Sequence, residues 1–171
     1  MNQVILLVTA VSRAVGVIAA LMIVLAVAIT CQMIFLRYFL NESTVWQTEV
    51  VIYLMIGATL LGLPYVQTLK GHVNVDLLPI MLPPKARKML LVTALAAGAA
   101  VLSVMTYYGG EIAHLAFTRN WTSDTVTAVP LWIPYISMPL GFGLFTLQLI
   151  ADMLELIATP ADKIIVEVGG H

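Results

Sequence analysis

Residues 14–36 read AVGVIAALMIVLAVAITCQMIFL and contain no charged side chain between Arg13 and Arg37. A helix needs roughly 20 apolar residues to cross a hydrocarbon core about 30 Å thick, and this run is long enough. Three further charge-free runs of similar length follow, at 50–69, 89–110 and 128–151. The sequence therefore predicts an all-α, polytopic membrane protein in which residues 1–171 form a single membrane domain with four transmembrane helices.

The composition of the whole chain agrees with this class. Of 171 residues, 61% are hydrophobic and 10% are charged, whereas soluble domains are roughly 45–50% apolar and about 25% charged. These values also exclude a disordered, collagen-like or coiled-coil protein. A β-barrel would alternate polar and apolar residues and would not show continuous apolar runs. Residues 1–12 lack the basic residue of a signal peptide, so we expect a retained first helix that begins early.

Lysine and arginine in the short connections predict the orientation, because cytoplasmic loops retain them. Six of the eight basic residues fall on the side of the two termini and the central connection: Arg13, Lys70, Lys85, Arg87, Lys88 and Lys163. The other two, Arg37 and Arg119, belong to the first and third connections. Both termini and the central connection are therefore expected inside.

The central connection, residues 70–88, is too short and too polar to span a membrane, yet too apolar for a solvated linker. We expect a short interfacial segment there, stopped by two prolines and followed by a basic cluster at the lipid headgroups. In the alternative, that cluster simply anchors the start of the third helix. If the segment is helical, His72 and Asp76 lie four residues apart and form a local hydrogen-bonded cap, with a proton or ion role as the alternative.

Several kinds of chemistry are excluded by what the sequence lacks. Cys31 has no partner for disulfide chemistry, and the three histidines are not placed as facing haem ligands. Glu111-Ile-Ala-His114 is one copy of a spacing that di-iron bundles use twice. No ionisable residue lies within the four charge-free runs, which argues against an ion pathway in this chain. We expect no catalytic residue, cofactor or metal, and hence no enzyme.

Small residues in these runs indicate close helix packing. Pairs four residues apart are Ala58 and Gly62, Ala94 and Gly98, and Ala96 and Ala100. Such pairs let helix backbones approach closely in membranes. A chain with packing surfaces and no chemistry is typical of an accessory subunit.

The order of several motifs resembles the small membrane subunit of TRAP transporters, of the DctQ/SiaQ type. The matching residues, between Arg37 and Ala151, are Arg37-Tyr38, Trp46-Gln-Thr-Glu49, Gly57, Gly71-His72-Val-Asn-Val-Asp76, Pro83 with the basic cluster, Thr122-Ser123 to Tyr135, and Pro139-Leu-Gly141. The resemblance implies a four-helix subunit with both termini inside, in a bacterial inner membrane. Its expected partners are the lipid bilayer, a large multi-helix transport subunit of the DctM/SiaM type and a periplasmic solute-binding protein, with no nucleic acid.

That resemblance implies sodium-driven uptake of carboxylate-bearing solutes, such as sialic acids or C4-dicarboxylates, by the large subunit, which the small subunit supports as a scaffold. The alternatives are a membrane-anchor subunit of a redox or other enzyme complex and, third, a stand-alone small transporter. The sequence offers no means of choosing the solute.

Physical roles follow for the matched residues. Trp46 suits an interfacial anchor, and Glu49 suits the positive N-terminus of the second helix. Arg37 is expected to pair with Glu49 or Glu42 across the short loop, with contact to a partner as the alternative. In the third connection, Arg119 and Trp121 suit either a docking surface for a partner or an aromatic belt.

Overall fold

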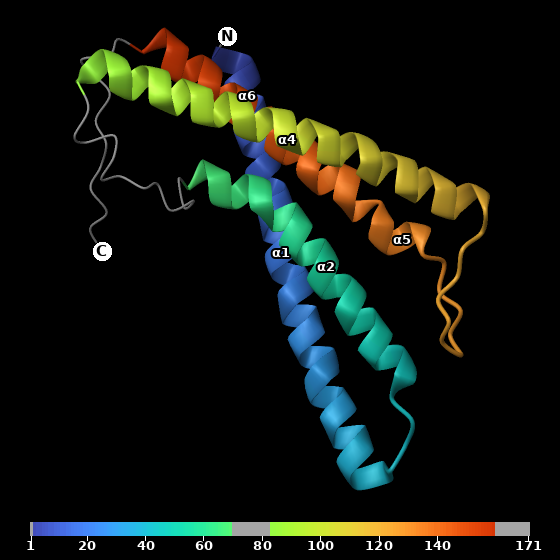
Figure 1. The fold of residues 1–171 in the computed structure, drawn as a ribbon. Coiled ribbons are helices and arrows are strands. Elements are labelled where there is room, and N and C mark those ends of the chain that lie inside the picture. Colours follow the sequence, from blue (N-terminus) through green and yellow to red (C-terminus); the bar gives the residue numbers. More distant parts are fainter. Residues whose placement is uncertain (1, 70–82, 160–171) are drawn as a thin grey trace.

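The computed structural model describes residues 2–69 and 83–159, and all of the long elements in these ranges are helices (Figure 1). They are α1 (Asn2–Phe35), a π-helical turn η1 (Leu36–Leu40), α2 (Val45–Thr68), α4 (Pro84–Thr118), the short α5 (Trp132–Tyr135) and α6 (Ser137–Ala158). Four of these segments are long and apolar enough to cross a membrane. The expected all-α fold with four candidate membrane spans is confirmed, while the orientation in the membrane stays a prediction.

Three of the helices, α1, α2 and α4, are longer than the charge-free runs that predicted them. α4 has 35 residues, where the run has 89–110, and such a helix is about 52 Å long, well beyond a hydrocarbon core of about 30 Å. Charged residues are tolerated in helix ends that reach the interface. The candidate spans therefore extend past the charge-free runs and include charged residues such as Glu49 and Asp152.

The basic cluster of the central connection lies at the start of α4. Pro83 is extended and Pro84 occupies the first helical turn, where a missing backbone N–H has no cost because it would have no partner. Lys85, Arg87 and Lys88 thus belong to the first turns of the helix, as the simpler alternative expected. The predicted interfacial segment itself, with His72 and Asp76, lies outside the described residues.

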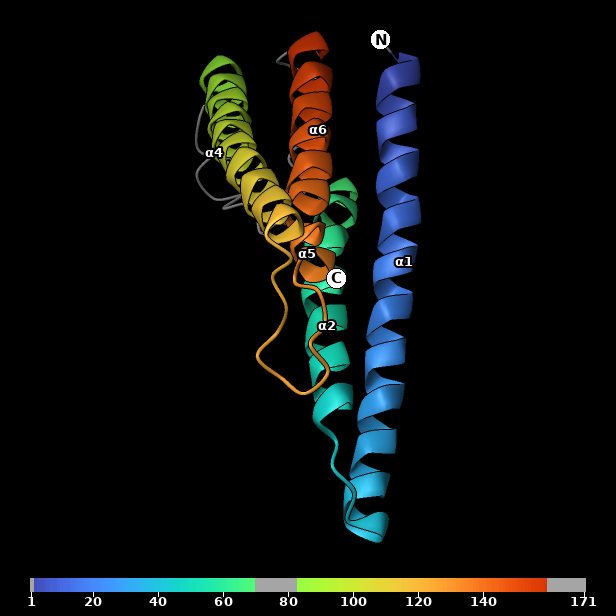
Figure 2. The same cartoon turned by 90° about the vertical axis from the view of Figure 1, so that its right-hand side faces the viewer.

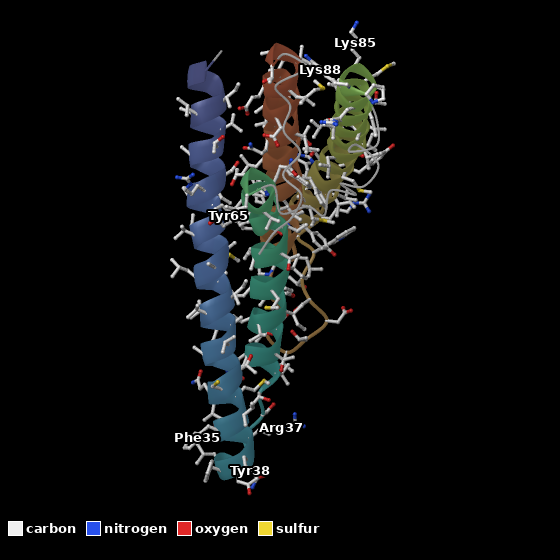
Figure 3. All side chains as sticks on the ribbon, turned by 90° about the vertical axis from the view of Figure 1, so that its left-hand side faces the viewer. Phe35, Arg37, Tyr38, Tyr65, Lys85 and Lys88 are labelled. Carbon is white, nitrogen blue, oxygen red and sulfur yellow. The ribbon has the colours of Figure 1, made fainter. Side chains whose placement is uncertain are left out.

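The chain forms two helical hairpins that meet along α2 and α6. α1 packs antiparallel against α2, and α4 packs antiparallel against α6. Figures 1 and 2 both show the hairpin of α1 and α2 extending past the far end of α4. Figure 3 shows Phe35, Arg37 and Tyr38 at that extended tip, whereas Lys85 and Lys88 lie at the opposite end of the molecule.

The described core is made of small side chains. Its buried hydrophobic residues are one leucine and six alanines: Leu149, Ala19, Ala26, Ala58, Ala99, Ala116 and Ala151. Large apolar side chains instead point outward along every long helix. This inversion is expected when the surrounding solvent is lipid, because burial of apolar surface then gives no gain and close backbone approach decides the packing.

The two hairpins approach each other closely at Gly141. A β-carbon on Gly141 would lie 2.5 Å from the carbonyl oxygen of Leu60. Pro64, buried in α2, lacks the N–H that would bond this same carbonyl within the helix. The proline therefore frees the oxygen against which α6 packs.

The predicted small pairs differ in their surroundings. Ala58 is buried, and β-carbons on Gly57 and Gly62 would contact Met22 and Ala19 of α1, so these residues lie at the α1–α2 interface. Ala94, Ala96 and Ala100 of α4 are exposed in this chain. Gly16, which packs against the ring of Tyr65, is a close contact that the pairs did not predict.

Candidate functional site

The connection from α4 to α5 folds back on itself as a small hairpin, residues 119–131. Ser123 donates its backbone N–H to Val129 at 2.9 Å, and Leu131 donates to Trp121 at 2.8 Å. Asn120 and Ala128 have positive φ angles of 49° and 44°, a region that Asn tolerates more readily than Ala. These turns return the chain toward the first turns of α2 (Figure 1).

Glu49 joins this hairpin to α2. Its side chain is 6% exposed, and its carboxylate accepts hydrogen bonds from the Tyr53 hydroxyl at 2.7 Å, from Thr125 at 2.7 Å and from Thr127. Because Thr125 has one hydroxyl hydrogen and donates it to Glu49, Ser123 donates to Thr125, at 2.8 Å. We call these five residues the Glu49 clasp.

The hydrogen bonds of the clasp are of a kind that holds two parts of a structure together. All of its donors are neutral hydroxyls, and hydrogen bonds to a charged acceptor are worth about 1.5–3 kcal/mol each. Glu49 is the fifth residue of α2 and so lies just past the first turn, where the positive end of the helix acts most strongly. Among the described residues, no group of three His, Cys, Asp or Glu side chains is arranged to hold a metal ion.

Arg37 takes no part in the clasp. It lines a polar hollow with Glu42 and Thr48 at the tip of the α1–α2 hairpin. Within the described residues the hydrogen bonds of Glu49 come from Tyr53 and the 119–131 hairpin and not from Arg37, so the expected pairing with Glu49 is not formed. Trp46 is 45% exposed, in contrast to Glu49 three residues later. Its anchoring role stays a prediction.

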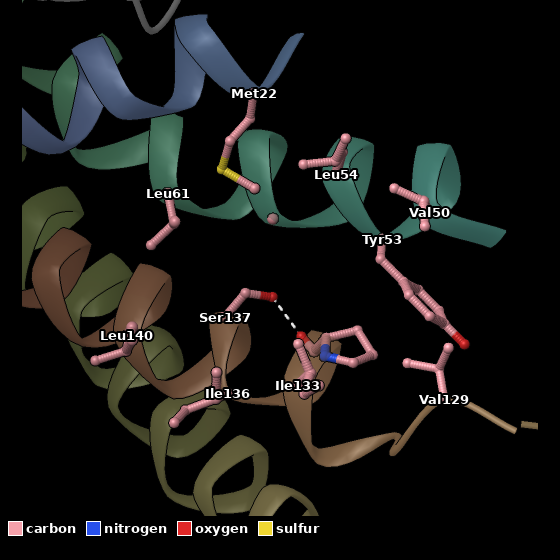
Figure 4. A pocket seen from close by; sticks show the side chains of 12 residues that line it. Met22, Val50, Tyr53, Leu54, Leu61, Val129, Ile133, Ile136, Ser137 and Leu140 are labelled. Carbon is pink, nitrogen blue, oxygen red and sulfur yellow. Dashed lines mark hydrogen bonds between the residues drawn. The ribbon is translucent and has the colours of Figure 1, made fainter. Parts of the chain in front are cut away.

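An apolar groove of about 370 Å³ lies next to the clasp, with α2 on one side and α5 and α6 on the other (Figure 4). Tyr53 and Val129 lie side by side at the end nearest the clasp, and Leu61 and Leu140 lie at the other end. Ser137 bonds the carbonyl of Pro134 at 2.6 Å, so its hydroxyl is satisfied locally. The groove therefore presents almost only apolar side chains.

A second polar network joins three helices at the opposite end of α2. Asp152 of α6 accepts from Gln67 of α2 at 2.7 Å and from Gln148 at 2.9 Å. Gln148 in turn accepts from Ser12 of α1 at 3.2 Å. Sequence reasoning missed this network, although a serine and two glutamines within apolar stretches were a signal for it.

Lys88 makes a contact that the sequence did not predict. Its ammonium donates to the backbone carbonyls of Ile157 and Thr159, at 2.8 and 2.7 Å. These are carbonyls at the C-terminus of α6, which have no donor within their own helix. Lys88 therefore caps α6 and joins it to the start of α4.

The residues of the third connection lie near the clasp. Arg119 follows the last residue of α4 and is exposed, and Trp121, at the base of the hairpin, is 37% exposed. Val126, at its tip, is 97% exposed. The predicted docking candidates thus lie in the same connection as the threonines that bond Glu49, and their role stays a prediction.

Four long apolar helices, joined by small residues and buried hydrogen bonds, define a polytopic membrane subunit built for packing. Residues 26–159 match the family model of the DctQ component of tripartite ATP-independent periplasmic transporters, and the chain belongs to this family. It is similar to the C4-dicarboxylate TRAP transporter small permease protein DctQ of Vibrio cholerae, with 22% identity over 159 residues. That alignment covers 81% of this chain and 67% of the relative. The resemblance noted from the motifs is confirmed: the chain is a small, non-catalytic permease subunit of a TRAP transporter.

Proposed function

We propose that this subunit is a scaffold for the large transport subunit of a sodium-driven uptake system in a bacterial inner membrane. It lies as one domain with both termini inside and with the 119–131 hairpin outside. A periplasmic binding protein delivers a carboxylate-bearing solute, and the large subunit moves it. The match of residues 26–159 to the DctQ component is the observation that carries this proposal.

The surface of α4 supports a packing role. Only Ala99, Gly109 and Ala116 of its 35 residues are buried within this chain. Ala96 and Ala100 leave a face of small side chains uncovered, and such a face allows another helix to approach closely. The large subunit is the partner expected on this face.

Purification in mild detergent together with the large subunit tests the proposal. We expect the two chains to copurify and, in proteoliposomes with the binding protein, to take up an organic acid only with an inward sodium gradient. C4-dicarboxylates are the first solutes to test, because the Vibrio cholerae relative is named for them, and sialic acids are the second. Haem or quinone in the purified complex would favour the membrane-anchor alternative instead, and uptake by this chain alone would favour the stand-alone transporter.

The candidate residues have separate tests in the same assay. If Trp121 belongs to a docking surface, Trp121→Ala should weaken binding of the periplasmic protein, and unchanged affinity would count against docking. His72→Ala should leave uptake intact if His72 and Asp76 form only a local cap. Reduced uptake after that substitution would point to a proton or ion role.

A further inference from the structure

We infer that the Glu49 clasp is a latch that sets the separation between α2 and the α5–α6 segment. This inference goes beyond the scaffold proposal and does not depend on it. It concerns the internal geometry of the chain, which is measurable whether or not a large subunit is bound.

Two of the attachments between α2 and the second hairpin flank the groove. One is the backbone contact of Gly141 with Leu60, and the other is the clasp at Glu49. They are separated by eleven residues, or about 16 Å of helix. The groove of about 370 Å³ occupies the interval, so side-chain packing there does not close the gap between α2 and α6.

The attachment at the clasp centres on one carboxylate. Among the described residues, Thr125 and Thr127 of the hairpin both donate to Glu49 on α2. Tyr53 lies one turn further along α2 and bonds the other carboxylate oxygen at 2.7 Å, which fixes the side chain toward the hairpin. Without this carboxylate, the hydroxyls of the hairpin lose their acceptor on α2.

The latch makes the hairpin and the groove respond together. Val129 belongs both to the returning strand of the hairpin, where its carbonyl accepts from Ser123, and to the lining of the groove. Tyr53 likewise belongs to the clasp and to the groove. Release of Glu49 should therefore let the hairpin move away from α2 and widen the groove at this end, while the contact at Gly141 remains.

Distances between paired spin labels test the latch in the full chain, in lipid nanodiscs, alone and with the large subunit. Cys31 is the single cysteine and is exposed, so Cys31→Ser gives the background. One label pair joins Ile52→Cys on α2 with Val126→Cys at the hairpin tip, both exposed positions. A second pair, Val66→Cys and Leu154→Cys, reports the opposite end.

In Glu49→Ala we expect the first pair to lose its narrow distance distribution and shift to longer distances, with the second pair unchanged. Glu42→Ala is the matched control, because Glu42 is an exposed carboxylate near the start of α2 and outside the clasp. It should leave both pairs unchanged. Thr125→Val with Thr127→Val should reproduce the Glu49→Ala shift, and adding Glu49→Ala to them should give no further shift.

An unchanged first pair in Glu49→Ala would overturn the latch, as would additive shifts in the combined variant. If Glu49→Ala does not insert or fold, the threonine variants alone decide, since they keep the carboxylate and remove only the hydroxyls. Failure of the scaffold proposal would appear differently, as loss of copurification with a normal first-pair distance in the isolated chain.

Discussion

Replacement of Gly141 by alanine tests whether the backbone contact between α2 and α6 joins the two hairpins. The new methyl group would lie 2.5 Å from the Leu60 carbonyl oxygen, 2.7 Å from its carbonyl carbon and 3.0 Å from its β-carbon. These nearest atoms cannot rotate away as a side-chain end can, so the helices must separate. The contact with Leu60 is the one that should be lost first.

The size of the effect follows from two opposing contributions. Overpacking of this kind costs about 1–3 kcal/mol, and the better helix propensity of alanine recovers up to about 1 kcal/mol. We expect a net loss of about 1–2 kcal/mol in the free energy of unfolding, or roughly 5- to 30-fold in the folding equilibrium. Leu60→Ala should not rescue the variant, because the two closest atoms belong to the backbone.

Equilibrium unfolding of the purified chain in mixed micelles, followed by tryptophan fluorescence, measures this loss. Gly62→Ala is the matched control, since its β-carbon would lie 3.8 Å from that of Ala19, an ordinary contact distance. That variant should be neutral or up to about 1 kcal/mol more stable. The reasoning is refuted if Gly141→Ala is as stable as Gly62→Ala.

Three other predictions concern the opposite end of the molecule and the orientation. Ser12→Ala removes the hydrogen bond to Gln148 and should lower the unfolding free energy by about 0.6 kcal/mol, the usual size of such bonds in membranes; no change in the same titration would contradict it. Lys88→Met should speed amide hydrogen exchange in the last turn of α6, which Lys88 caps, while Lys85→Met should not. Equal exchange rates in both variants would contradict the capping role of Lys88. Cysteines at Asn41 and Lys85 should be labelled from opposite sides of the membrane, and labelling of both from one side would contradict the orientation.

The sequence predicted the helices well because their signal is local. Charge-free runs such as 14–36 indicate a helix by composition alone, and the four candidate spans follow them. The ends of the helices are harder to predict from composition, because a helix continues past the hydrocarbon until a turn or a cap stops it. Arg13 therefore lies inside α1 and the basic residue Lys88 inside α4.

The clasp could not be predicted from the sequence, because it joins residues that are far apart in the chain. The pattern Trp46-Gln-Thr-Glu49 marks the start of a helix but carries no information on Thr125 and Thr127, more than 70 residues later in the chain. Only the fold of the 119–131 hairpin brings them to Glu49. The concentration of hydroxyls in residues 122–127 was the one available signal, and it did not indicate a partner.

The alanine core has a consequence for how the chain can vary. At Ala19, Ala26, Ala58 and Ala116 almost every substitution enlarges the side chain, so these positions should accept little besides glycine and serine. The bulky outward residues, by contrast, should exchange freely among leucine, isoleucine, valine and phenylalanine. In a saturation mutagenesis experiment, the smallest side chains would therefore be the most restricted, which reverses the usual pattern of a soluble protein of this size.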